Sequence, residues 1–284
     1  MPAAAPFGSS LPYRGVFGQP RPGALSAVPL PPAPMPAWRG RRPLKAWRYV
    51  GVFDSELMLC LASVRIGPAR QSFWAVWDRG ARRLYERTRR GRGAVRLTPR
   101  RAQISDGAVS IDLDLDETAG IETVCATGSA YGWTRKQGGI RARGTVKLGG
   151  RRIRLHARAV IDDTAAYYER HTVWRWSAGV GHAEDGRELA WNLVQGVNDP
   201  LHDSERTVWI DGVATEAPPV RFHPGLTGIG ALHFQPEATR QRHENLLLVR
   251  SAYRQPFGSF SGVLPGGVSL AAGYGVMEEH DVWW

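Results

Sequence analysis

From residue 45 onward, apolar and polar side chains alternate along most of the chain with a period of two. Residues 109–115 (VSIDLDL) place serine and aspartate between apolar positions, and residues 151–161 (RRIRLHARAVI) place arginines and a histidine there. This alternation is typical of antiparallel strands with one buried and one solvated face. No segment longer than about two turns follows the period of a helix, so we expect few helices.

Short turn motifs separate these runs, among them SDGA, KQGG, LGGRR and LPGG. DG and GG pairs between alternating runs favour tight β-hairpins, because glycine reaches the positive φ values that such turns need. The spacing corresponds to roughly fifteen strands. It therefore predicts an all-β, antiparallel architecture of the barrel or sandwich type, in which two halves pack together.

The chain divides into three predicted parts. Residues 1–43 are rich in proline and alanine. Proline neither donates to a strand ladder nor fits a helix interior, so we expect an extended arm on the surface. Residues 44–161 would form an N-terminal barrel-like half and residues 162–284 a C-terminal one. The division falls where DDTAAYYER, residues 162–170, interrupts the alternation.

The composition allows a large folded core. Apolar residues make up 43% of the 284 positions, and eleven tryptophans are spread from Trp38 to Trp284. Large rings suit both sheet surfaces and cavities that bind ligands. Cys60 and Cys125 lie in apolar runs with no CxxC motif, so we expect two buried free thiols.

The sequence also bears on where in the cell the protein is located. Residues 1–15 lack a basic segment followed by a long apolar stretch, so we do not expect a signal peptide. No apolar run approaches about 18 residues, the length that a membrane-spanning helix needs. We therefore expect a cytoplasmic protein without a transmembrane segment, and the sequence leaves the oligomeric state open.

The net charge of +11 is concentrated in one block. Residues 79–158 contain 19 Lys/Arg against 7 Asp/Glu, an excess of 12 positive charges. Such a field can attract nucleic acid, anionic lipid or an acidic substrate. Arginine replaces lysine throughout, since only Lys45, Lys136 and Lys147 are lysines. This composition favours a solvated basic face, and a nucleic-acid partner is not expected.

The common catalytic signatures are absent from the sequence. It has no GxSxG, no HExxH, no P-loop and no GxGxxG that opens a helix. Most of the eight histidines lie far apart along the chain, unlike the ligands of metal sites. We therefore expect neither a metal nor a cofactor.

The segment HTVWRWSAGVG, residues 171–181, is the first candidate site. In a strand over 172–178, Trp174 and Trp176 share one face with Thr172 and Ala178. The opposite face carries His171, Val173, Arg175 and Ser177. Either the tryptophans pack in a core and the polar face meets water, or one face lines a cavity.

The second candidate is residues 191–212, where amides and carboxylates interrupt an apolar strand. Asn192 and Asn198 point one way and Gln195 the other. A buried amide costs stability without partners, so these residues indicate a hydrogen-bond network or a ligand contact. A turn is expected at residues 198–200, with Asp199 bonded to its own backbone. A simple surface pair of Glu205 and Arg206 is the alternative.

The third candidate is the C-terminal MEEHDVWW, which sets three carboxylates beside one imidazole. Glu278, Glu279 and Asp281 could raise the pKa of His280 and keep a general acid near neutral pH. The alternative is a solvated strand whose tryptophans dock into the core.

Several of these strings resemble the bacterial family catalogued as domain of unknown function 2804. The resemblance runs from about Leu11 to the C-terminus and rests on HTVWRWSAGVG, WNLVQGVNDP, SERTVWIDG, YRQPFGSFSG and GYGVMEEHDVWW. That family has no established reaction, so the resemblance implies no catalytic residue. The chain is also distantly similar to tandem lipocalin-type barrel proteins, which include carotenoid hydratases and tocopherol cyclase. This similarity implies two lipocalin-like halves.

One functional hypothesis is a cofactor-free enzyme that hydrates, isomerises or cyclises a hydrophobic small molecule. Tryptophan faces would stabilise its cationic intermediates. His171 or His280 would be the acid, oriented by Asp199, Glu205 or Glu278. The residues expected to bind substrate are Trp174, Arg175, Trp176, Asn192, Gln195 and Asn198.

Two other hypotheses stay open. A barrel-like interior can carry a lipid or pigment without any reaction. The basic block over residues 79–158 could instead bind an anionic surface or nucleic acid, in which case affinity would fall steeply with added salt.

Overall fold

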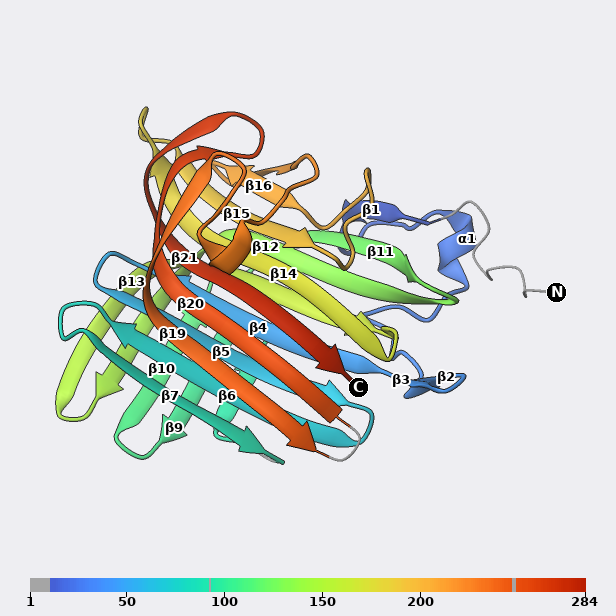
Figure 1. Cartoon of the computed structure of the whole chain (residues 1–284), viewed down its shortest axis with the longest axis horizontal. Helices are drawn as coiled ribbons and strands as arrows, with labels where there is room; N and C mark the ends of the chain where they lie inside the picture. The colour runs from blue at the N-terminus through green and yellow to red at the C-terminus, as the bar shows by residue number, and fades with distance from the viewer. Residues whose placement is uncertain (1–10, 92, 247–248) are drawn as a thin grey trace.

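The computed structural model describes residues 11–91, 93–246 and 249–284, and consists almost wholly of antiparallel strands (Figure 1). The fold is all-β with few helices, as the alternation predicts. Residues 1–10, which bear on the expectation about a signal peptide, lie outside the described residues. Within the described part of the chain, no helix has the length and apolar character needed to cross a membrane.

Two large sheets account for nearly all strands. The first sheet contains β1 (Tyr13–Val16), β4 (Lys45–Phe53), β5 (Leu57–Ile66), β6 (Ala69–Asp78), β7 (Arg83–Arg90), β8 (Val95–Thr98), β9 (Arg101–Asp106), β10 (Val109–Leu115), β11 (Ile121–Thr127), β12 (Ala130–Leu148) and β13 (Arg151–Ala166). The second contains β14 (His171–Ala183), β15 (Glu188–Gln195), β16 (Thr207–Ile210), β17 (Val213–Glu216), β18 (Gly228–Ile229), β19 (Leu232–Leu246), β20 (Val249–Leu264) and β21 (Val268–Trp283).

The segment expected to be an extended arm is partly built into the fold. Strand β1 pairs with β11 at the edge of the first sheet. The small hairpin of β2 (Trp38–Arg39) and β3 (Arg42–Pro43) and the one-turn helix α1 (Gly23–Ser26) complete it. Strand β13 continues to Ala166, beyond the expected division at residues 161/162, and the chain enters the second sheet at His171.

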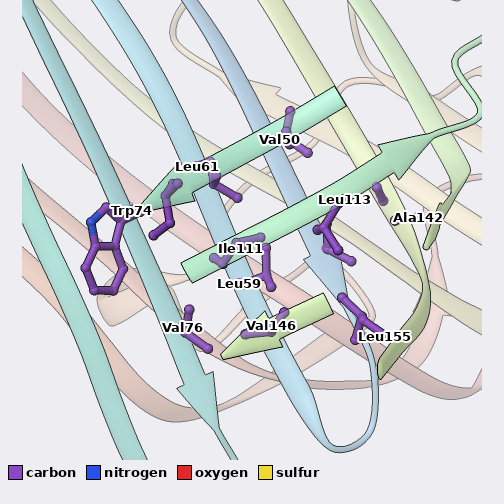
Figure 2. Packing of buried hydrophobic residues seen from close by; sticks show 14 of the residues in the cluster. Val50, Leu59, Leu61, Trp74, Val76, Ile111, Leu113, Ala142, Val146 and Leu155 are labelled. Atoms are coloured by element: carbon purple, nitrogen blue, oxygen red, sulfur yellow. The ribbon is translucent and has the colours of Figure 1, made fainter. Parts of the chain in front are cut away.

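Each sheet curls around a core of its own. In the first sheet, Leu59 and Leu61 of β5 pack against Ile111 and Leu113 of β10 (Figure 2). In the second sheet, Trp191 of β15 packs in the same way with residues of β19–β21. The hydrogen-bonded strand order is nevertheless open in both, so within the described residues neither sheet closes into a barrel.

The two sheets pack back to back through a third apolar layer. Strand β5 shows why, because all six residues of 57–62 (LMLCLA) are buried. Its odd positions face the core of the first sheet, whereas Met58 and Cys60 face Trp176 and Val276 of the second sheet. Figure 1 shows β14 and β19–β21 lying across β4–β6. A strand that is buried on both faces cannot show polar alternation.

Both cysteines are buried free thiols, as the sequence predicts. Cys60 lies in the layer between the sheets and Cys125 lies on β11. Burial raises the pKa of each thiol to about 12, so neither is a thiolate at neutral pH.

The layer between the sheets is divided into two compartments by an apolar seal, which is formed by Val160 of β13 and Trp209 of β16. On one face of β13, Asp162 lies to one side of Val160 and Arg158 to the other. Gly138 belongs to an irregular step in β12 and receives the indole of Trp209 from the second sheet. A cavity and an open groove therefore lie at opposite ends of one interface.

Gly138→Ala should test this seal. A Cβ at residue 138 would lie 2.3 Å from the Trp209 ring, and Gly138 is itself buried. Overpacking of this kind costs about 1–3 kcal/mol, so we expect a lower midpoint of urea unfolding. Gly150→Ala is the matched control, because nothing lies within 4 Å of its Cβ. Equal stability of the two variants would contradict the seal.

Candidate active site between the two sheets

A cavity of about 160 Å³ lies between the sheets, at the end of the interface that holds Asp162. Eight aromatic rings contribute to its wall. They come from both sheets: Trp47, Tyr49, Phe73, Tyr168, Trp174, Trp176, Tyr253 and Trp284. The tryptophan face of the 171–178 segment thus points into the cavity, and the strand predicted there is part of β14.

The tryptophans are held in fixed orientations. Trp174 is stacked between Trp47, with centroids 6.2 Å apart, and Trp284, with centroids 6.5 Å apart. Its indole N–H donates to Glu278 Oε1 (2.8 Å), and that of Trp176 donates to Asn192 Oδ1 (2.8 Å). Rings fixed in this way give an apolar ligand a preformed wall, and binding against it costs no further side-chain entropy.

Three ionisable side chains meet at one end of the cavity. Lys136 Nζ lies 2.6 Å from Asp162 Oδ1 and 3.4 Å from Glu205 Oε2, and all three side chains are less than a tenth exposed. Although burial lowers the pKa of Lys136, the two carboxyl groups, Asp162 foremost, leave it above the ordinary value. One ammonium cannot neutralise two carboxylates, so one acid is driven towards its protonated form.

Glu205 is that acid. Burial, opposed by Lys136 and reinforced by Asp162, raises the pKa of Glu205 to about 7. Asp162 is the closer partner of the ammonium, and it also accepts a hydrogen bond from Thr164 (2.9 Å). A carboxylic acid that titrates near neutral pH can both donate and recover a proton.

An amide and a phenol lie beside this acid. Asn198 Nδ2 donates to Tyr168 OH (2.7 Å) and to Glu205 Oε2 (3.2 Å). Asn198 Oδ1 is buried and has no hydrogen-bond partner among the described residues. The backbone of Asn198 is left-handed, with φ 49°, a conformation that asparagine tolerates better than most residues. A buried acceptor without a partner is costly and can be satisfied by a ligand donor.

Glu278 occupies another part of the cavity wall. It accepts hydrogen bonds from Trp174, from Tyr253 OH (2.9 Å) and from Gln255 Nε2 (3.0 Å). Burial raises the pKa of Glu278, and these donors oppose the rise. Arg240 lies near it, 4.0 Å above the ring of Phe73. Glu278 is thus an anchored acceptor that fixes the orientation of two aromatic rings.

His280 lines the cavity, but the expectation that its pKa is raised is wrong. Burial lowers the pKa of His280 to about 3, and Asp281 only partly opposes this. Asp281 and Glu279 point to the outer face of β21, since alternate residues of a strand face opposite ways. The neutral imidazole is hydrogen-bonded to Ser251 Oγ (2.8 Å) and cannot supply a proton at neutral pH.

Four of the other candidate residues lie outside the cavity. His171 is exposed, pairs with Asp281 (2.9 Å) and stacks on Trp283. Arg175 pairs with Glu279 on the outer face. Asp199 accepts from the backbone N–H of Gly196, and Gln195 accepts from that of Phe222.

Two further expectations change in the structure. Asn192 does not line the cavity; it is buried behind it, where it fixes Trp176 and donates to the backbone carbonyl of Glu205 (3.0 Å). Glu205 and Arg206 are not a surface pair, because both are buried. The Arg206 guanidinium donates instead to the carbonyls of Pro200 and Ala217 and so secures the loop that carries Asn198.

From the sequence alone, no site role was assigned to Lys136, Asp162, Tyr168 or Arg240. Asp162 and Tyr168 could have been noticed, because they lie in the segment that interrupts the alternation. Lys136 is also one of only three lysines and sits in a strand that is largely buried. Among the described residues, no group of three or more His, Cys, Asp or Glu side chains could hold a metal ion.

The sequence matches one protein family, and the structure is distantly similar to several solved structures. A family model described as "Domain of unknown function (DUF2804)" matches residues 86–284. A candidate AttH protein from Nitrosomonas europaea is 13% identical, with a TM-score of 0.48, and the match covers 89% of this chain and 98% of that one. No curated protein matches the sequence.

Two other solved structures are similar at the same level. Kievitone hydratase from Nectria haematococca is 10% identical, with a TM-score of 0.47 over 83% of this chain and 88% of that one. CghA with Sch210972 is 11% identical, with a TM-score of 0.42 over 96% and 98%.

Glu205→Gln should change how stability depends on pH. A carboxyl whose pKa rises from 4.5 to about 7 on folding binds more protons in the folded state. The free energy of unfolding should therefore fall as pH increases between these values, by on the order of 3 kcal/mol, and level off above pH 7. Glutamine mimics the neutral acid, so the variant should gain stability relative to wild type across this window. Urea unfolding at several pH values measures the difference, and a difference independent of pH would contradict the assignment.

Proposed function

The chain belongs to the family described as "Domain of unknown function (DUF2804)", and from the site itself we propose that it is an acid catalyst for a small apolar substrate. The observation that carries this proposal is the buried Glu205, whose pKa is raised to about 7 beside an aromatic cavity. The reaction would be a hydration, an isomerisation or a cyclisation that begins with proton transfer to the substrate.

The size of the cavity supports a narrow class of substrate. Its volume of about 160 Å³ is close to that of an apolar cavity of about 150 Å³ that holds benzene. The reacting group is therefore about the size of one six-membered ring, either a whole molecule or the end of a longer one. A substrate hydroxyl would donate to Asn198 Oδ1 and accept from the Tyr168 hydroxyl, because both Nδ2 hydrogens of Asn198 are already donated.

The proton would follow a balanced path. Lys136 and Asn198 both face Oε2 of Glu205, so the acidic proton belongs on Oε1. Glu205 gives this proton to a double bond or an oxygen of the substrate, which leaves a glutamate and a substrate cation. Attack by water then releases a proton that restores the acid, and loss of a different substrate proton gives an isomer instead.

The surroundings would stabilise the charges that develop. Lys136 lies close enough to favour the Glu205 carboxylate once the proton has left. The electron-rich aromatic wall of the cavity and the anchored Glu278 carboxyl would stabilise a positive charge on the substrate. His280 remains neutral throughout and shapes the wall.

A carrier of the same ligand is the alternative function. The aromatic wall would suffice for such binding. A carrier has no use for a buried acid that costs stability above neutral pH, and this cost favours the catalytic role.

Proton transfer should be detectable before the natural substrate is known. We expect the protein in heavy water to exchange deuterium into ring-sized probes, such as cyclohexenone, methylcyclohexene or a tertiary cyclohexenol, as measured by mass spectrometry. Glu205→Gln should lower this rate by about 100-fold or more, the usual contribution of a general acid.

The controls separate catalysis from carriage. His171→Ala should keep the full rate, since His171 lies outside the cavity. Tryptophan fluorescence reports binding of the probe in every variant. A probe that binds wild type and Glu205→Gln equally, without deuterium exchange in either, would establish a carrier and overturn the enzyme.

A further inference from the structure

The second compartment between the sheets is an open groove of about 570 Å³ on the far side of the apolar seal. Its floor is the basic end of β12 and β13, and its opposite wall comes from β14 and β21. Ionisable side chains line it: Asp54, Arg141, Arg143, His156, Arg158, His182 and Glu188. This groove has no part in the proposed reaction.

The arrangement of two arginines in the groove is unfavourable on its own. Arg141 of β12 is directly opposite Arg158 of β13 in the ladder. Like charges in this position repel each other, because the Cβ atoms of such pairs are only about 5 Å apart. The next pair on the same face is Arg143 and His156, and there Arg143 is already paired with Asp116 (2.8 Å). Such a pair lowers the stability of a sheet unless a negative charge lies close to it.

The protein neutralises this charge only in part. Arg158 donates to the backbone carbonyl of Gly181, and its nearest carboxylate is that of Glu188 at 3.5 Å. Glu188 is itself half exposed, so its charge is screened by water. Within the described residues, no hydrogen bond or ion pair engages the side chain of Arg141. Burial lowers the pKa of Arg158, and the carboxylates of Glu188 and Asp211 oppose this only in part.

Apolar side chains also line the groove. Ala157, Tyr274 and the largely buried Phe53 and Val180 lie beside the two guanidinium groups. Arg158 is held in place by Gly181, whereas the exposed Arg141 can adjust to a ligand. Two guanidinium groups suit the several oxygens of a phosphate or carboxylate, which accept paired hydrogen bonds.

We propose that this groove binds a small organic anion, with its phosphate or carboxylate between Arg141 and Arg158 and its apolar part against Phe53 and Tyr274. The site is separate from the cavity that holds Glu205, and occupation relieves the repulsion between the paired arginines. The basic excess of the chain is thus partly a ligand site and not only a solvated face.

Calorimetry with phenyl phosphate, benzoate and inorganic phosphate at constant ionic strength tests the proposal. We expect saturable binding of one phenyl phosphate or one benzoate per chain, and weaker binding of inorganic phosphate, which lacks the apolar part. The tighter of the two aromatic anions identifies the charged group. Arg141→Gln should weaken binding about tenfold or more, as expected for a charge-assisted hydrogen bond.

Arg154→Gln is the matched control. Arg154 is exposed on the same face of β13 but does not line the groove, so its loss should leave the affinity unchanged. Thermal unfolding verifies that both variants are folded. Equal losses in the two variants would show attraction to the basic face as a whole and overturn the proposal. Tighter binding of a single-stranded oligonucleotide that depends on Arg152 and Arg154 would assign the face to a polymer and overturn it too.

Discussion

Burial of Lys136, Asp162 and Glu205 between two sheets is the constraint on which the rest of the site depends. The three groups lie in a layer that is otherwise aromatic and aliphatic, where an unpaired charge is expensive. A single ammonium pairs with the nearer Asp162, so Glu205 keeps a proton up to about pH 7. The Trp47–Trp174 stack and Asn198 then shield Glu205 from water, so its pKa stays above the ordinary value for glutamate.

Local periodicity was sufficient to predict many of the strands and to place Trp174 and Trp176 on one face, but it left open whether that face lines a cavity. Alternation over residues 109–115 and 151–161 predicts β10 and β13, and the placement of Trp174 and Trp176 on one face is confirmed. The run of 57–62 carries no alternation because its strand is buried on both faces. When two sheets pack face to face, the apolar pattern of a strand shows that it is buried, but it does not show which part of the protein covers each face.

The chemistry of the site depended on pairings that local sequence does not encode. Lys136 meets Asp162 through the register of β12 and β13, and the irregular step after Gln137 decides which later residues share that face. His280 has carboxylates as chain neighbours, yet burial among aromatic rings governs its pKa. The same face of β13 passes from Asp162 through Val160 to Arg158, so one strand serves both the cavity and the basic groove.

The protonation state of Glu205 in the folded protein is the central claim, and it can be measured without a substrate. Carbon NMR of protein labelled at the glutamate side-chain carboxyl, compared with the Glu205→Gln variant, isolates the signal of this one group. We expect a resonance that titrates with an apparent pKa near 7 and is absent from the variant. A Glu205 signal that titrates near the ordinary glutamate value of about 4.3 would contradict it.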